Sequence, residues 1–347
     1  MIEDSIQVAL MGSINSLDFR GDKGIAYDYQ NRQITLFDTE GEIVMAKEFA
    51  LEGPGSIGHV TNLKILEDGN ILVYQFGNKM PLLNEALEVQ RYYEMSFPAE
   101  LRGAAYFQHM YAQHEDDVYL FFPGRDGGNP YLDNFYKDYK LVEKLNLSTG
   151  NSESVFKLAS DSKYLTDLKF DYPMMALSAG EGEIYLALDT ESLIHVYSPD
   201  AKEESLITLD FSPSKFVQME GSNEEYASSY GKMLKGGVKN LFAIPNGVVV
   251  HYSEGIEGEV YKREALHDRE NWPKLPDFDN NMLKVYQQDK GWSNEVQVPC
   301  HMKTISGIMD LNDSFWALRN DDYIGEEQDY LTFYRVRLKQ NNNSPSL

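Results

Sequence analysis

Polar side chains that could hold a cation or a small ligand recur at a similar position in six apolar stretches of the sequence. The stretches are aligned by the turn that follows each one, with a register uncertain by one residue. This alignment brings together Asn15, Asn62, His109, Ala176, Asn240 and Ser306. Asparagine carbonyl oxygens suit hard cations such as calcium, although amide side chains also solvate trapped water. The pattern favours a water-filled ring lined by Asn15, Asn62, Asn240 and Ser306, with a calcium site as the alternative.

Carboxylates lie near this ring in the sequence but do not belong to it. Asp18 and Asp310 come at least one step farther along their stretches, and Asp171 precedes the fourth stretch. Calcium sites depend on carboxylate oxygens, so one of these three side chains would have to reach inward. The sequence therefore predicts no metal site in its preferred interpretation.

Basic residues precede several of the same stretches and form a second pattern. In a chain of net charge −24, basic residues gathered at one place would create a local positive field that attracts a small anionic molecule or a glycan. Aromatic residues such as Tyr172 could add a stacking surface, although tyrosines in sheets more often pack in the core. Each basic residue alone is equally consistent with a solvated loop. The pattern predicts a ligand-binding set of His59, Arg102, His109, Tyr172, Lys235 and His301.

Nucleophilic catalysis has little support in this sequence. The chain contains no Gly-x-Ser-x-Gly motif, and its seven histidines lack the spacing of a metal-binding helix. Cys300 is the only cysteine, so it cannot form an internal disulfide. We interpret Cys300 as a small buried side chain, and we assign no catalytic residue.

Charge and hydropathy narrow the classes of partner. The 55 acidic residues outnumber the 31 basic ones, which disfavours nucleic acids and anionic membrane surfaces because their binding requires Lys and Arg. No stretch approaches the roughly 20 apolar residues of a transmembrane helix. The first residues do not resemble a signal peptide. We expect a soluble chain, and the alternative that a targeting segment has been removed is left open.

The elements that position these residues are visible as one sheet unit that repeats six times. Turns rich in Asp, Asn and Gly separate pairs of apolar stretches at intervals of 46 to 66 residues, which is the range of a four-stranded propeller blade with insertions. Asp68-Gly69 and Asn246-Gly247 are strong hairpin signals. The turns contain residues 21–24, 67–70, 114–117, 180–183, 244–247 and 311–313.

The two ends of the chain complete each other in this scheme. The last unit lacks a strand, and residues 6–11 form a strand that has no unit of its own. Pairing the two ends would close the ring and remove exposed sheet edges. The sequence therefore predicts an all-β, six-bladed β-propeller in one domain, residues 1–340, with a flexible tail at 341–347.

Two segments depart from the strand pattern. Residues 223–236 show helical spacing of apolar side chains and lead into the fifth unit, and residues 263–279 contain two prolines and form a long excursion inside that unit. Structured insertions often line or cover a binding face, and they equally often serve as packing covers.

The strand at residues 34–38, the segment Glu52-Gly53-Pro54-Gly55-Ser56-Ile57-Gly58 and the strand that begins at Val60 carry a family resemblance. This passage is similar to the first-to-second blade junction of six-bladed envelope lipoproteins of Bacteroidetes, which are NHL- and TolB-like propellers of the type called domain of unknown function 4221. The resemblance implies a location in the cell envelope or periplasm, with lipid anchoring of a full-length precursor. It supplies no catalytic set.

The functional expectation follows from the ring, the basic residues and the resemblance. We expect a non-enzymatic binding or scaffold propeller whose partner is a small anionic molecule, a glycan or a protein. The alternative is a propeller enzyme of lactonase, hydrolase or lyase type. Such an enzyme would use a cation, for example calcium, held by side chains in the central channel.

Overall fold

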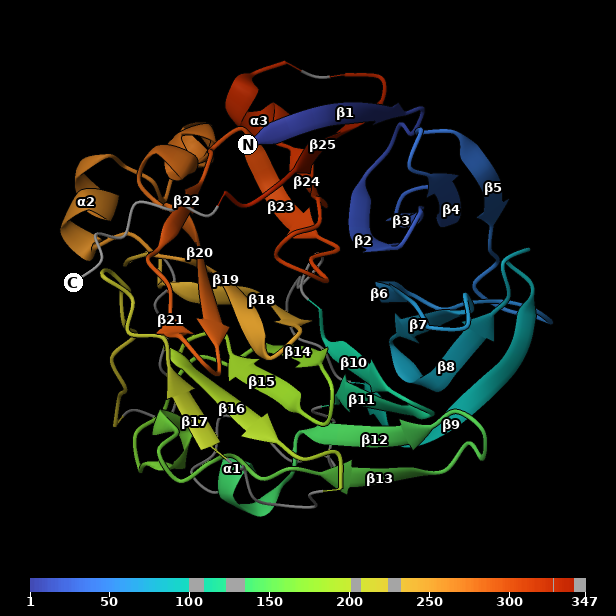
Figure 1. The fold of residues 1–347 in the computed structure, drawn as a ribbon, viewed down its shortest axis with the longest axis horizontal. Coiled ribbons are helices and arrows are strands. Elements are labelled where there is room, and N and C mark those ends of the chain that lie inside the picture. The colour runs from blue at the N-terminus through green and yellow to red at the C-terminus, as the bar shows by residue number, and fades with distance from the viewer. Residues whose placement is uncertain (100–108, 123–134, 201–206, 224–231, 327, 340–347) are drawn as a thin grey trace.

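The computed structural model describes residues 1–99, 109–122, 135–200, 207–223, 232–326 and 328–339. Within them, six antiparallel sheets stand around a central axis, each with its first strand next to the axis (Figure 1). The predicted all-β, six-bladed propeller is confirmed. The predicted tail at 341–347 and the predicted site residue Arg102 lie outside the described residues.

Blades one to three follow each other along the chain with four strands each. Blade one contains β2 (Ile14–Arg20), β3 (Lys23–Asp28), β4 (Gln33–Asp38) and β5 (Ile43–Glu48). Blade two contains β6 (Val60–Ile65), β7 (Ile71–Gln75), β8 (Gly77–Leu83) and β9 (Val89–Ala99). Blade three contains β10 (Tyr111–His114), β11 (Asp117–Phe121), β12 (Val142–Asn146) and β13 (Ser152–Val155).

Blades four to six complete the ring. Blade four contains β14 (Met175–Ala179), β15 (Ile184–Leu188), β16 (Leu193–Tyr197) and β17 (Ile207–Asp210). Blade five contains β18 (Gly237–Ile244), β19 (Gly247–Ser253), β20 (Asn281–Gln287), β21 (Gly291–Trp292) and β22 (Val296–Val298). Blade six contains β23 (Met302–Ser306), β24 (Phe315–Arg319), β25 (Leu331–Val336) and β1 (Ile2–Val8).

The N-terminal strand closes the ring, as the sequence predicted. β1 pairs antiparallel with β25, and the register places Ile6 opposite Phe333 (Figure 1). Ile6 and Val8 point into the core and are buried, while their neighbours along β1 are exposed. This alternation fixes the register of β1, because a shift by one residue would expose both apolar side chains.

The six predicted turns each join the first strand of a blade to the second. The turn between β6 and β7 contains Gly69 at φ +84°, and the turn between β18 and β19 contains Asn246 at φ 58°. Asparagine and glycine tolerate this left-handed conformation, which hairpin turns require. We call the side of the ring that carries these turns the turn face, and the side where the chain leads into each first strand the lead-in face.

Neighbouring blades are joined by apolar packing and by buried tyrosine hydroxyl groups. Tyr74 of blade two donates to the Phe121 carbonyl of blade three at 2.6 Å, and Tyr111 donates back to the Leu72 carbonyl at 3.1 Å. Burying a tyrosine contributes apolar area while its hydroxyl group keeps a partner. These reciprocal bonds fix β7, the second strand of blade two, against the first two strands of blade three, β10 and β11.

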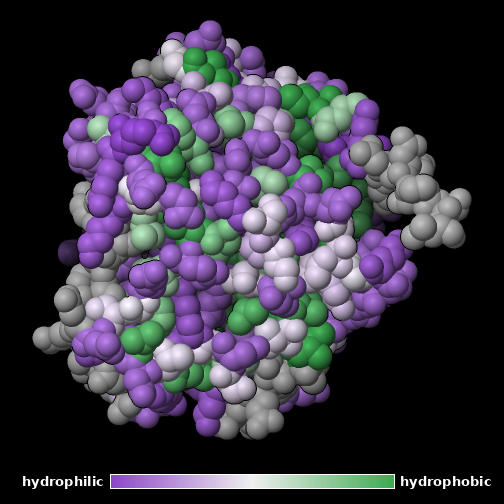
Figure 2. All heavy atoms as spheres, turned by 90° about the vertical axis from the view of Figure 1, so that its left-hand side faces the viewer, coloured by the Kyte–Doolittle hydropathy of each residue, from purple (hydrophilic) through white to green (hydrophobic). Residues whose placement is uncertain are grey.

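The excursion in blade five separates β19 from β20 and contains α2 (Gly258–Arg263) and the 3₁₀ helix η2 (Arg269–Asp277). The other short helices are α1 (Phe135–Asp138), η1 (Lys163–Leu165) and α3 (Asp321–Ile324). Figure 2 looks onto the side of the ring that carries α2, where hydrophilic residues predominate around smaller hydrophobic patches. No helix in the described part of the chain is long and apolar enough to cross a bilayer.

The helical spacing noted over 223–236 can be compared with the structure only at residue 223 and over residues 232–236. Residues 224–231 lie outside the described residues, and residues 232–236 form no helix. Instead, Leu234 forms an isolated antiparallel bridge with Ile256. This backbone pairing holds the segment extended as it approaches β18, so tertiary contacts override the helical spacing.

Candidate functional site

The first strands of four blades contain a β-bulge near their lead-in end. The register shifts between Ile14 and Ser16 in β2, between Val60 and Asn62 in β6, and at the corresponding places in β18 and β23. A bulge adds one residue to a strand and redirects the side chains that follow. The bulges therefore decide which residues of these strands face the axis.

The predicted channel residues are all buried, but they do not occupy one level of the strands. Asn62 and Asn240 are equivalent, since each follows a bulge directly. Asn15 lies one residue earlier, within its bulge, and Ser306 lies two residues beyond the equivalent Thr304. Asn15 Oδ1 and Ser306 Oγ are buried without a hydrogen-bond partner among the described residues.

His109 lies at the centre of the ring and contacts three other blades. Its backbone N–H donates to Asn240 Oδ1 of blade five at 2.6 Å, and its ring lies 5.4 Å from that of Phe242. Its carbonyl accepts from the Leu177 N–H of blade four at 2.8 Å. Its Nε2 atom lies 3.8 Å from Asp18 Oδ1 of blade one. His109 therefore links blade three to blades one, four and five.

Asp18 is a buried carboxylate with one oxygen satisfied and one not. Its Oδ2 atom accepts from the Ile65 N–H at 2.9 Å, which also ties β2 to β6. Its Oδ1 atom has no hydrogen-bond partner among the described residues. Lys64 Nζ is 3.7 Å from this oxygen, which is too long for a hydrogen bond.

Asp18, Lys64 and His109 line a cavity of about 170 Å³ on the turn-face side of the channel. The first strands of five blades and the segment after β23 all contribute to its wall, including Ser178, Phe242 and Met309. This volume is small beside the roughly 300 Å³ and more of drug-sized sites. The cavity is suited to one polar group of a ligand rather than to a whole large molecule.

Burial sets the protonation of this cluster. Burial raises the pKa of the Asp18 carboxyl group, and the nearby Lys64 ammonium group opposes that rise. Burial, together with the repulsion of Lys64, holds the pKa of His109 well below its usual range, so its imidazole is neutral at pH 7. A neutral imidazole offers one donor and one acceptor to a ligand.

The cluster thus presents an unsatisfied acceptor beside a cationic donor. A hydroxyl or carboxamide group placed between them could donate to Asp18 Oδ1 and accept from Lys64 Nζ. Charge-assisted bonds of this kind are shorter and stronger than neutral ones. The arrangement therefore favours a neutral group with both functions over a simple anion or a simple cation.

The other predicted ligand residues have separate surroundings on the lead-in face. Lys235 Nζ is 3.4 Å from Asp189 Oδ2, in an ion pair that is largely buried. His59 is exposed near Tyr29, Tyr172 is half-buried near Phe121, and His301 meets the Tyr334 ring edge to face at 5.6 Å. Their binding role stays a prediction, and of the described members of that set His109 alone lines the channel cavity.

Lys64 is the site residue that the sequence reasoning missed, and Asp18 entered only as a residue that would have to reach inward. Both interrupt apolar first strands, in Leu17-Asp18-Phe19 and Leu63-Lys64-Ile65. A charge between two buried residues of an inner strand is the signal that could have identified them. In the described part of the chain, no three His, Cys, Asp or Glu side chains are grouped as a metal site requires.

Comparison with known proteins gives similarity in fold. No protein-family model matches the chain, and no curated protein matches it by sequence. Its structure is similar to a DUF4221 family member from Bacteroides vulgatus, with a TM-score of 0.69 and 12% identity over 98% of both chains. It is also similar to a Bacteroides fragilis protein named for its expected export, with a TM-score of 0.55 and 10% identity over 97% of this chain and 95% of the other.

A third similarity is to virginiamycin B lyase from Staphylococcus aureus, with 10% identity over 96% of this chain and 98% of the other. Its TM-score of 0.47 is too low to support an argument about function. The resemblance expected from the sequence is confirmed at the level of the fold: the chain is a six-bladed β-propeller similar to the DUF4221 member.

Proposed function

We propose that this protein is a ligand-binding propeller that holds a hydroxyl or carboxamide group of its ligand in the channel cavity. The observation that carries the proposal is the pair of Asp18 Oδ1 and Lys64 Nζ, which face the same small cavity without a hydrogen bond between them. Buried polar atoms are normally paired, and exceptions concentrate at functional sites. His109 and Phe242 would form the floor against which the ligand group stops.

The cell envelope is the proposed location. Two solved structures with similar folds come from Bacteroides, and one of those proteins is named for its expected export. Similarity in fold at this low identity supports the location only as an expectation. Secretion of the full-length protein in its own host, followed by cell fractionation, would test it.

The binding test uses calorimetric titration with two sets of probes, namely neutral oligosaccharides such as cellohexaose and serine-centred pentapeptides. We expect at least one set to bind, and Asp18→Asn to weaken that binding about tenfold, because the variant replaces the free acceptor with an amide donor. Asp200→Asn is the matched control, since Asp200 is exposed and far from the cavity in the fold. Failure of both sets to bind, or equal binding by Asp18→Asn, would contradict the proposal.

The second candidate is the cation-dependent enzyme of lactonase, hydrolase or lyase type. It is favoured by the presence of one carboxylate, Asp18, in the channel beside a histidine. Against it, the Lys64 ammonium group lies 3.7 Å from the free oxygen and would repel a divalent cation there. Calorimetric titration with calcium separates the two candidates, because calcium binding that disappears in Asp18→Asn would favour the enzyme.

A further inference from the structure

Three adjoining hollows cross the turn face. The channel cavity shares Glu67 and Gln113 with a hollow of about 390 Å³ between blades two and three. On the other side it shares Phe19 and Met309 with a hollow of about 230 Å³ between blades six and one. We call these hollows the acidic end and the cationic end. Because each shares lining residues with the central cavity, we call the three hollows together the groove.

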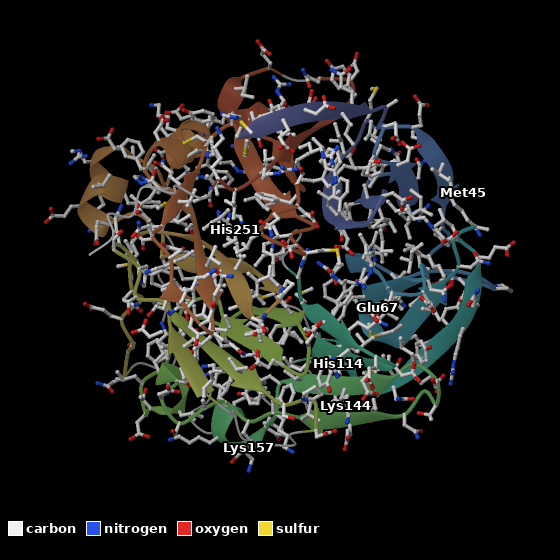
Figure 3. The ribbon with its side chains drawn as sticks, viewed as in Figure 1. Met45, Glu67, His114, Lys144, Lys157 and His251 are labelled. Carbon is white, nitrogen blue, oxygen red and sulfur yellow. The ribbon has the colours of Figure 1, made fainter. Side chains whose placement is uncertain are left out.

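The acidic end has an apolar floor and a carboxylate rim. Leu66, Leu82 and Leu147 form its floor, and no lysine or arginine is among the described residues that line it. Four carboxylates line it, namely Glu67, Asp68, Glu115 and Asp116. Glu67 is nearer to the axis of the ring than Met45 or Lys157 (Figure 3), and it is paired with Arg20 at 3.0 Å.

The cationic end places arginines beside aromatic rings. Arg335 of β25 stands opposite Trp316 of β24 in the sheet register, and Trp316 stacks on Phe19 with ring centres 5.4 Å apart. Arg337 is held by Glu3 at 3.2 Å and by Ser314. The Arg335 side chain is exposed and has no ion pair with any described residue. Asp4 of β1 stands opposite Arg335 in the register and Asp313 lines the same hollow, but neither forms an ion pair with it, so its guanidinium group can still bind a ligand carboxylate.

A single ligand chemistry matches this order of groups. A primary amine suits the carboxylate rim, a hydroxyl or carboxamide group suits Asp18 and Lys64, and a carboxylate suits Arg335. A neutral glycan would leave both charged ends unused.

We propose that the ligand is a short peptide with free termini that lies extended across the turn face. Its amino terminus occupies the acidic end, its carboxylate meets Arg335, and a central Ser, Thr, Asn or Gln side chain enters the channel cavity. This inference names the ligand of the channel site and therefore rests on the proposed function. Asp18, whose free oxygen is buried in the central cavity, would accept a hydrogen bond from the central side chain of the peptide and so set the position of the peptide in the groove.

The test is a calorimetric titration with serine-centred alanine peptides of four to seven residues, a series that samples the span because an extended residue covers about 3.3 Å. Each peptide is used with free ends, with an acetylated amino terminus and with an amidated carboxyl terminus. We expect either modification to weaken binding about fivefold at the best length, as the loss of one exposed charge pair predicts.

Variants assign each effect to one end of the groove. In Arg335→Met, amidation should no longer weaken binding, while acetylation still does. In the double variant Glu115→Gln with Asp116→Asn, acetylation should weaken binding less than it does in the parent, while amidation keeps its full effect. Arg263→Met on α2, where Arg263 is also exposed, is the matched control and should retain both effects. All these side chains are on the surface, so we expect folded variants.

The outcomes separate the two proposals. Peptides that bind equally well with blocked ends would overturn the peptide inference. Oligosaccharide binding that depends on Asp18, without peptide binding, would overturn it while leaving the channel site intact. Peptide binding that depends on both ends but not on Asp18 would overturn the proposed function of the cavity and retain the groove.

Discussion

On the turn face, Asp18 has one satisfied oxygen and one free oxygen, whereas on the lead-in face both oxygens of Asp189 are engaged. Asp189 Oδ1 accepts from the Met174 N–H at 3.0 Å, and Oδ2 pairs with Lys235 at 3.4 Å. Burial raises the pKa of both carboxyl groups, so the two differ in partners rather than in solvation. The lead-in carboxylate is thus occupied by partners within the fold, while the turn-face carboxylate keeps one oxygen available to a ligand.

Two arginines, Arg319 near the lead-in face and Arg335 on the turn face, differ in the same way. The buried guanidinium group of Arg319, in blade six, lies 2.9 Å from Asp321 and 3.0 Å from Glu326. On the turn face, by contrast, the exposed Arg335 has no ion pair among the described residues. Lys235 and Arg319 of the lead-in face are thus already in ion pairs, which leaves these two side chains less available to an anionic ligand than the sequence pattern suggested for Lys235.

The largest effect is expected from Lys235→Met. The substitution keeps the apolar stem but leaves Asp189 buried with a single partner, which should lower the free energy of unfolding by about 2 kcal/mol. Urea denaturation at pH 7 measures it. The exposed Lys262→Met is the matched control and should change stability by less than about 0.5 kcal/mol. Equal stability of the two variants would show that Lys235 has no structural role and is available for ligand binding, contrary to the contrast drawn between the two faces.

The next largest effect is on the loss of stability at acidic pH. Because the pKa of His109 is held below that of an unfolded histidine, the stability it contributes is present above about pH 6.5 and is lost as the pH falls toward the folded value. His109→Gln should therefore flatten the decline of stability between pH 7 and pH 4.5. Urea midpoints across this range measure the slope. His301→Gln, on the lead-in face, is the matched control, and an unchanged slope in His109→Gln would show that this histidine is not buried as described.

Asp18→Asn is expected to change the pH dependence of stability in the opposite sense. The raised pKa of Asp18 means that its favourable contribution is full below about pH 3.8 and is lost as the pH rises through the folded value. The asparagine variant lacks this loss, so its stability relative to the parent should increase from pH 4 to pH 7. A relative stability that instead falls over this range would indicate that Asp18 is already well paired.

The smallest effect is expected from Arg20→Met. Arg20 and Glu67 form an exposed pair at 3.0 Å on the turn face, and such pairs contribute about 0.5 kcal/mol or less. Thermal unfolding should therefore change little. A loss comparable to that of Lys235→Met would mean that the turn face, too, is organised by structural ion pairs.

Much of the fold could be predicted from the sequence because its signals are local. Alternating apolar residues select strands, and turn residues such as Asn246 and Gly69 select hairpins, so six repeated units emerge without knowledge of distant contacts. The strand that begins the chain had no unit of its own, and β25 of the last unit needed a strand on its outer side, so the two were expected to pair. Over 232–236, the pairing of Leu234 with Ile256 replaced the helical preference that the local spacing suggested.

The site was less predictable because β-bulges and inter-blade contacts decide it. One extra residue in an inner strand changes which side chains face the axis, and the sequence does not show where the bulge falls. This is why Asn62 and Asn240 align while Asn15 and Ser306 do not. By itself the sequence determined the strands, the turns and the closure of the ring. Only the tertiary structure decided that Asp18, Lys64 and His109 from three blades meet in one cavity, because no local signal links residues on different blades.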